Sequence, residues 1–296
     1  MPPRCLRTLC LLAAAFLLSG AAAFAQLRVT TWNLNWFPDG SQKGASAEVQ
    51  AQRIQAAADT LRKIDSDALL LQEVRDYAVC VRLAEAIKPN TYSVAVCSAF
   101  REPFVPGDGI GRQQVAILVK TPALAAWTEK WKALGRVDPP RGFAFAWLRV
   151  KGRDYGVYCV HLKSNLVRGD DPNAVRKNIL KRELATSQLA AHLKDTLAKV
   201  IPTIQTVVVG GDFNTNIDEP AFAEEQTLTN LTAAGFTNCW SGVPLEKRIT
   251  HPKNGRYPGA TFDYLFLRGG KLNGPAVLAP AWSSDHQPVT VEVSPE

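Results

Sequence analysis

The most informative segment of the chain reads Val207-Val208-Val209-Gly210-Gly211-Asp212-Phe213-Asn214-Thr215-Asn216. Three successive β-branched residues predict a buried strand, and the two glycines allow a sharp turn or the close approach of a ligand. Asp212 and Asn214 follow where the strand gives way to a loop, and in extended backbone they point to the same side. A carboxylate there can hold or activate a water while the amide orients it. The same residues are equally typical of a strand that ends in an Asx-turn. The choice between a water-binding site and a simple turn depends on the rest of the sequence.

The beginning of the chain has the form of a secretory signal peptide. Arg4 and Arg7 precede an apolar run at 9–18, and Ala23-Phe24-Ala25 fits a cleavage site with small residues. The run is too short to span a bilayer as a stable helix, although an uncleaved anchor is the alternative. We expect a signal peptide at 1–25 and one domain at 26–296, exported to the periplasm or the medium, monomeric and without stable membrane insertion.

Composition and charge narrow the class of partner. The 296 residues are 46% hydrophobic, which is ample for a sizeable core. The formal net charge of +7 becomes +5 once Arg4 and Arg7 leave with the leader. A basic chain favours anionic partners such as nucleic acid or an anionic membrane surface. The segment 168–182, with Arg176, Lys177 and Lys181, either contacts a phosphate backbone or is a solvated helix face.

Four cysteines remain after the leader, and an even number in an exported chain suggests disulfides. None has the C-x-x-C spacing of a zinc site. We predict a Cys80–Cys97 bond that closes a short loop, and a Cys159–Cys239 bond as the second. Buried free thiols are the alternative.

Apolar patterning predicts strands that alternate with helices and also pair as hairpins. The expected helices are 47–64, 76–87, 173–200 and 219–234. The expected strands are 27–34, 68–71, 92–96, 115–119, 142–150, 155–162, the valine strand, 236–240, 261–267, 276–278 and 289–293. This mixture indicates mixed sheets with helices outside, an α/β sandwich rather than an all-parallel barrel.

Polar residues gather at the ends of several of these strands. In open α/β sheets, ligands lie beyond the carboxyl ends of the strands. Each residue alone has an ordinary explanation as a surface acid, a core histidine or a turn, and only the joint pattern points to a site. Its members are Asn33, Asn35, Glu73, His161, Lys163, Asn165, Asp212, Asn214, Asp263, Asp285 and His286.

The pattern resembles the endonuclease/exonuclease/phosphatase superfamily, which includes deoxyribonucleases, abasic-site endonucleases, sphingomyelinases and inositol-phosphate phosphatases. The matching motifs occur in the family's order across the mature chain. They are Thr31-Trp32-Asn33, Leu71-Gln72-Glu73-Val74, Val160-His161-Leu162-Lys163-Ser164, Gly211-Asp212-Phe213-Asn214, Phe262-Asp263-Tyr264 and Ser284-Asp285-His286-Gln287-Pro288-Val289. The resemblance implies a four-layer α/β sandwich, in which two mixed β-sheets pack face to face with helices outside.

The resemblance also implies roles for the site residues. Glu73 is the main ligand of Mg²⁺, with Mn²⁺ or Ca²⁺ as alternatives, and Asn35 and Asp285 are additional ligands. Asp212, oriented by Asn214, aligns or deprotonates the attacking water. His286, oriented by Asp263, stabilises the charge of the scissile phosphate. His161 does the same or protonates the leaving oxygen, and the phosphate-binding residues are Asn33, Lys163 and Asn165.

The chain departs from the family's pattern at two positions. Asn35 stands where some members carry an acid, and Gln113 stands where the deoxyribonuclease branch carries an acid that pairs with the first histidine. We therefore expect His161 to be less tightly held. The implied function is an exported metal-dependent phosphodiesterase, most simply an endonuclease acting on DNA or RNA. The alternatives are a phospholipase C-like or sphingomyelinase-like enzyme, a small-phosphoester phosphatase and, more distantly, a catalytically silent binding protein.

Overall fold

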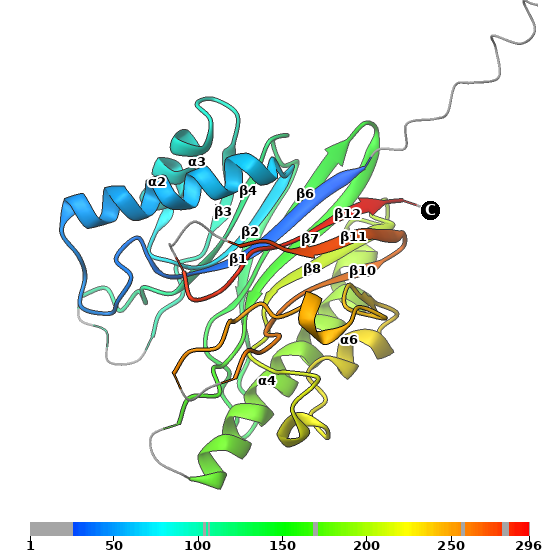
Figure 1. Ribbon diagram of the computed structural model, residues 1–296. Helices are drawn as coiled ribbons and strands as arrows, with labels where there is room; N and C mark the ends of the chain where they lie inside the picture. The colour runs from blue at the N-terminus through cyan, green and yellow to red at the C-terminus, as the bar shows by residue number, and fades with distance from the viewer. Residues whose placement is uncertain are drawn as a thin grey trace, which may run out of the picture.

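The computed structural model describes residues 26–102, 105, 107–167, 171–255, 258–279 and 284–295. Two six-stranded mixed β-sheets pack face to face, and helices cover both outer faces (Figure 1). The expected four-layer sandwich is therefore confirmed. The expected signal peptide at 1–25 lies outside the described residues, and so does Arg168. Within the described part of the chain, no helix is both long and apolar enough to cross a membrane.

The first sheet places the first and last described strands side by side. Its strand order is β11-β12-β1-β2-β4-β3, and its outer face is covered by α2 (Ala47–Ile64) and α3 (Tyr77–Ile87) (Figure 1). Ser46 and Asp76 cap these helices through their side chains, as expected for helix starts. The strands are β1 (Leu27–Phe37), β2 (Ala68–Val74), β3 (Ser93–Cys97), β4 (Gln114–Val119), β11 (Lys271–Val277) and β12 (Val289–Ser294).

The second sheet contains the valine strand at its centre. Its order is β5-β6-β7-β8-β10-β9, and the residues of β8 are all buried. The strands are β5 (Ala125–Lys130), β6 (Gly142–Val150), β7 (Arg153–His161), β8 (Thr206–Asp212), β9 (Thr237–Asn238) and β10 (Asp263–Arg268). Its outer side carries α4 (Pro172–His192), the π-helical turn η1 (Leu193–Leu197), α5 (Ala198–Val200), α6 (Thr229–Ala233) and the short 3₁₀ turns η2 (Pro220–Phe222) and η3 (Leu245–Lys247).

The main hydrophobic core lies between the two sheets and extends to the helices outside the second sheet, and a second core lies between the first sheet and its helices. Leu70 of β2 and Leu265 of β10 approach the backbone of β8 so closely that a Cβ at Gly210 would stand 2.6 Å from each side chain. Gly210 therefore permits tight packing across the central strand.

The expected helix at 219–234 is largely wrong, since only η2 and the five residues of α6 are helical there. Glu225, in the middle of the segment, is buried and binds Arg182 of α4 through two hydrogen bonds of 2.6 and 2.7 Å. We attribute the break to this tertiary contact, which outweighs local helix propensity. Strand β5 was not expected, and β11 is longer than the expected 276–278.

None of the four cysteines of the domain is disulfide-bonded in the structure. Cys159 lies on β7 and Cys239 pairs with β10, so two strands separate them. Three strand spacings amount to roughly 14 Å, far beyond the reach of a disulfide, and the predicted Cys159–Cys239 bond is therefore wrong. Cys80 and Cys97 are neighbours whose contact, together with burial, raises the pKa of the Cys80 thiol. Their bond stays a prediction.

Candidate active site

The register of three neighbouring strands brings the central residues together. His161 at the end of β7 lies opposite Asp212 at the end of β8, and Asp263 of β10 lies opposite Asp212 on its other side. Because β10 is antiparallel to β8, Asp263 begins its strand and still lies at the carboxyl end of β8. The three residues form one row at the edge of the second sheet.

Asp212 is a buried carboxylate held by two donors. Asn33 Nδ2 lies 2.9 Å from its Oδ2, and the backbone N of Asn214 lies 2.9 Å from its Oδ1. Burial raises the pKa of Asp212 to about 7. The positive charge of His286 lowers this pKa, and the negative charge of Asp263 raises it further. A carboxylate with a pKa near neutrality is suited to accept a proton from a water.

His286 lies next to Asp212, and its ring is oriented by Asp263. Its Nδ1 donates to Asp263 Oδ2 at 2.8 Å, and its Nε2 lies 3.9 Å from Asp212 Oδ2. Burial alone would lower its pKa, but the carboxylates of Asp263 and Asp212 raise the pKa of His286 to about 10. Trp32 Nε1 also donates to the His286 carbonyl at 2.9 Å. At neutral pH this residue is therefore a fixed imidazolium.

Glu73 belongs to the first sheet and faces the row of β7, β8 and β10. Its Oε1 accepts from Asn33 Nδ2 at 3.2 Å, and its Oε2 accepts from the backbone N of Trp36 at 2.9 Å. Asn33 thus touches both Glu73 and Asp212, and its Oδ1 accepts from the backbone N of Asn35 at 3.0 Å. The Asn33 side chain joins the two sheets at the site.

The backbone around the site adopts an unusual conformation. Left-handed φ values between 51° and 65° occur at Asn35, Trp36, Glu73, Arg141 and Asn214. Residues other than glycine are strained there, and such strain gathers at functional sites where the surrounding structure over-determines it.

The His161 side chain is buried, and neither of its ring nitrogens has a close partner among the described residues. Its Nε2 lies 3.6 Å from Asp212 Oδ2 and 3.8 Å from Glu73 Oε1, both beyond hydrogen-bond distance, and its buried Nδ1 has no partner among the described residues. Burial, with the charges of Arg141, His286 and Lys163, lowers its pKa well below the usual value. This agrees with the expectation, drawn from Gln113, of a loosely held ring.

Asn214, Asn165 and Lys163 form the loop beside His161. Asn214 Nδ2 donates to the Leu162 carbonyl at 3.3 Å, and Asn165 Nδ2 donates to the Asn214 carbonyl at 2.5 Å. Burial, together with the charges of Arg141, Lys181 and Arg182, lowers the pKa of Lys163. Several cations thus meet on this side of the site.

One cleft of about 1120 Å³ unites the predicted residues. All but two of them line its wall. Asn33 and Asp263 lie beneath the wall and bind lining residues instead. The arrangement can bind an anion, hold an ionised carboxylate beside it and keep both groups out of bulk water.

Oxygen atoms suited to a hard divalent cation face the same cleft. Each oxygen of Glu73 accepts one hydrogen bond and keeps a second lone pair, and Asn35 and Asp285 line the cleft with it. Burial alone would raise the pKa of Asp285, but His251 and His286 lower it. This donor set fits Mg²⁺. Ligand atoms of Asp212, Asp263 and His286 also lie within 4.8 Å of one another, but there His286 Nδ1 is already bound to Asp263.

Two residues of the site were missed from the sequence. Arg141 is buried and donates from Nε and Nη2 to the carbonyls of His161 and Leu162 at 3.0 and 2.9 Å. His251 stands with its Nε2 3.8 Å from Asp285 Oδ2 and its ring 4.9 Å from that of His286. Each is isolated in the sequence. The only local signal is a neighbouring proline, in Pro139-Pro140-Arg141 and in Thr250-His251-Pro252, which indicates a turn.

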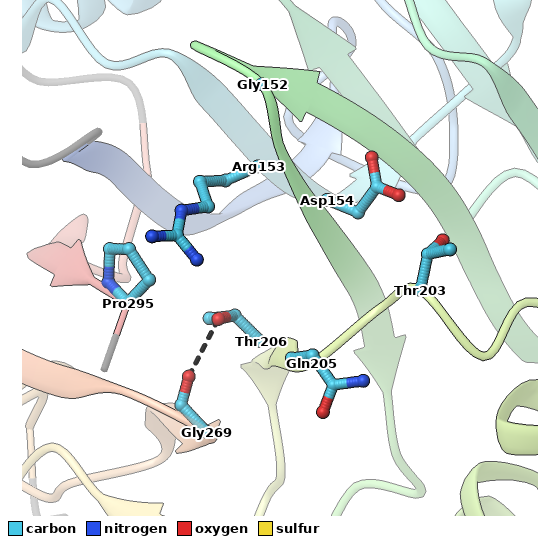
Figure 2. Close-up of a pocket in the computed structure, with 8 residues that line it drawn as sticks. All are labelled: Gly152, Arg153, Asp154, Thr203, Gln205, Thr206, Gly269 and Pro295. Carbon is cyan, nitrogen blue, oxygen red and sulfur yellow. Dashed lines mark hydrogen bonds between the residues drawn. The ribbon is translucent and has the colours of Figure 1, made fainter.

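A second cleft, of about 540 Å³, lies at the opposite edge of the second sheet. Figure 2 shows Arg153 and Asp154 at the start of β7, and Thr206 Oγ1 donating to the Gly269 carbonyl at 2.7 Å. Eight residues of extended strand, roughly 26 Å, separate Arg153 from His161. The lining of this cleft includes no histidine, so the candidate chemistry belongs to the first cleft.

Comparison with known proteins adds a family match and a group of similar folds. The profile of the Endonuclease/Exonuclease/phosphatase family matches residues 30–286. No curated protein matches the chain.

Solved structures with a similar fold include an endonuclease/exonuclease/phosphatase family protein from Leptotrichia buccalis. It is 17% identical, the alignment covers 90% of this chain and 99% of that one, and the TM-score is 0.61. Another is the human nocturnin catalytic domain with bound sulfate, at 17% identity, with 92% of this chain and 96% of that one covered and a TM-score of 0.62. A third is D. rerio TDP2 with a single-stranded DNA product, at 15% identity, with 91% of this chain and 99% of that one covered and a TM-score of 0.61. At these identities the likeness concerns the fold.

Proposed function

Since the chain belongs to the endonuclease/exonuclease/phosphatase family, we propose that it is a metal-dependent phosphodiesterase that hydrolyses nucleic acid. One observation carries the proposal: a buried carboxylate aligned by two donors lies 3.9 Å from an imidazolium that a second carboxylate orients. In-line attack of water on a phosphodiester needs an aligned nucleophile and a fixed positive charge, and these groups supply both.

The residues have distinct roles in this reaction. Asp212 accepts a proton from the attacking water, and its two donors keep the carboxylate in one orientation. His286 binds a non-bridging phosphate oxygen as an imidazolium. His161, uncharged because of burial, contacts the phosphate from the other side, and Lys163 adds positive charge. Glu73, with Asn35 and Asp285, would hold Mg²⁺, which neutralises charge on the phosphate.

Nucleic acid is supported as the substrate by charge and by one structural relative. Lys163 and Lys181 stand close enough for Lys181 to depress the pKa of Lys163, and D. rerio TDP2 is known with a single-stranded DNA product. The basic segment 168–182 contributes less than expected, because Arg182 is fully buried and paired with Glu225. Arg176, Lys177 and Lys181 are the other cations of its described part, and Arg176 Nη1 lies 4.0 Å from Glu183 Oε1.

A lipid or small phosphoester is the second candidate. Leu166, 73% exposed, lines the cleft with Val167 and Phe222, and an exposed apolar rim is what an enzyme acting at a lipid surface needs. We also propose export directed by residues 1–25. Recovery of the protein outside the cytoplasm, with Gln26 as its first residue, is the expected result.

The test compares substrates on the purified protein. We expect DNA or RNA to be cleaved with Mg²⁺ and to survive in excess chelator, with sphingomyelin vesicles left intact. Asp212→Asn and His286→Ala should each remove most of the rate, and the double variant should lose far less than the sum of the two. Vesicle hydrolysis with untouched nucleic acid would instead support the second candidate.

A further inference from the structure

Three aromatic rings, those of Phe222, His251 and Phe262, line the cleft that contains Asp212 and the two site histidines. Asp212 Oδ2 is approached by His161 at 3.6 Å and by His286 at 3.9 Å, so these two histidines mark the sides of the reaction centre. Phe222 lines the cleft and is linked through Arg182 to Lys163, which follows His161 by two residues. His251 and Phe262 line the cleft beside His286, with ring centroids 4.9 and 6.5 Å from that of His286. None of these three rings has a part in the proposed hydrolysis.

Phe222 is supported from within the protein. The guanidinium of Arg182 lies 5.7 Å from the centre of its ring, and this arginine is fully buried between Glu225 and the Lys163 carbonyl, to which its Nη1 donates at 3.0 Å. The supporting charge therefore cannot swing away. Phe222 is half-buried, and it sits near Lys163, which follows His161 by two residues.

His251 and Phe262 form a second, rigid pair of rings. Their centroids are 5.6 Å apart. The backbones of His251 and Ala260 exchange two hydrogen bonds of 2.9 Å, and the Phe262 backbone is held by Thr250 Oγ1 at 2.9 Å and by the Phe213 N–H at 2.8 Å. Both rings are half-buried and line the cleft, so each presents a surface whose position the backbone fixes.

We propose that these rings are stacking platforms for unpaired bases, and that the substrate is a single-stranded nucleic acid. This inference rests on the proposed function. A base has two apolar faces that prefer aromatic surfaces, and stacking accepts any base because every base has a π-face. In a duplex those faces are covered by neighbouring base pairs. A strand that crosses the cleft without a complement can place one base on Phe222 and another on His251 and Phe262.

Binding measurements separate base stacking from charge. The Asp212→Asn protein is titrated with fluorescent oligothymidylate and with an abasic deoxyribose phosphate chain of the same length, which has the same charge but no bases. We expect oligothymidylate to bind about 5- to 150-fold more tightly, as the usual strength of one stacked base implies. Equal affinities would overturn the inference.

Variants locate the effect in the protein. Phe222→Leu and Phe262→Leu should each raise KM for single-stranded DNA about 5-fold or more, with little change in kcat, and should leave hydrolysis of the abasic chain unchanged. Phe222→Tyr and Phe262→Tyr, which keep an aromatic face, should behave as the unmodified protein. Tyr77→Leu serves as the matched control, because Tyr77 is an exposed aromatic residue of α3 that does not line the cleft.

Strand preference provides the last test. The unmodified protein should hydrolyse a single strand faster than the duplex of the same sequence. Equal rates on the two forms would overturn the platforms and leave the proposed nuclease intact. Hydrolysis of vesicles with no cleavage of any nucleic acid would overturn the proposed function itself.

Discussion

Asp212 and His286 define a pH window at the scale of single residues. Asp212 acts when ionised, and burial raises its pKa to about 7. His286 acts when protonated, and although burial opposes it, the two neighbouring carboxylates raise its pKa to about 10. We therefore predict that kcat/KM rises through about pH 7 and falls through about pH 10. A pH profile at constant metal concentration measures both limbs.

Asp263→Asn is the matching control for that profile. Asp263 contributes the largest charge that raises the pKa of His286, so its removal should move the upper limb to lower pH. An unchanged upper limb would mean that another group is titrating there.

Glu73→Gln tests the metal site at the same scale. Gln keeps an oxygen that can accept from the Trp36 N–H but loses the negative charge that a hard cation requires. We expect activity to fall by about 10²-fold or more while the thermal midpoint stays within a few degrees. Isothermal titration with Mg²⁺ on both proteins shows whether the loss comes from metal binding. Full activity of the unmodified enzyme in excess chelator would contradict the prediction.

The buried pair Arg182–Glu225 acts at the scale of elements, because it ties α4 to the irregular segment before α6 and to the Lys163 carbonyl. Removing one partner leaves an uncompensated buried charge. We predict that Arg182→Met destabilises the protein by about 3–5 kcal/mol, as measured by urea unfolding.

The paired variant Arg182→Met/Glu225→Leu controls for the charge itself. It should recover most of the lost stability, since neither charge then remains buried. If the double variant is as unstable as the single one, packing rather than charge explains the loss.

Cys80 of α3 and Cys97 of β3 test a second link between elements. Their side chains are adjacent, and a bond between them would close a short loop that stabilises the fold by about 3 kcal/mol in the chain-entropy model. We predict that non-reduced protein recovered outside the cytoplasm yields a linked Cys80–Cys97 peptide by mass spectrometry, while Cys159 and Cys239 remain alkylatable. Four alkylatable thiols in that sample would refute it.

Local patterns account for what could be predicted of the elements. The valine strand and the polar residues after apolar runs were visible because each signal lies within a few neighbouring positions. Strand β5 was not visible, since Ala125–Lys130 has few β-branched residues and is a partly exposed edge paired only with β6. Arg141 was hidden for a related reason: its partner His161 lies 20 residues away, and only the fold brings them together.

At the scale of the whole molecule, positive charge should govern binding. The formal charge is +7 for the full chain and +5 without residues 1–25. Each phosphate neutralised on a single strand contributes about −0.7 to the slope of log K against log salt. We predict a steep fall of affinity for oligothymidylate with salt, and a shallower slope in Lys163→Gln and Lys181→Gln.

Lys120→Gln is the matched control for the salt series. Lys120 binds Asp65 at 2.8 Å and does not line the cleft. The slope of log K against log salt for Lys120→Gln should therefore equal that of the unmodified protein. Equal slopes for all three variants would place the phosphate contacts elsewhere.

The first and last strands are neighbours, with β12 paired along Leu27–Thr31 of β1, and Trp32 binds the carbonyl of His286. A ribosome therefore finishes almost the whole protein before the reaction centre can exist. A nascent chain already contains Glu73, His161, Asp212 and Asp263, yet it lacks the imidazolium that balances them. Under the proposed function, we therefore expect a C-terminally truncated copy that lacks His286 to leave nucleic acid intact.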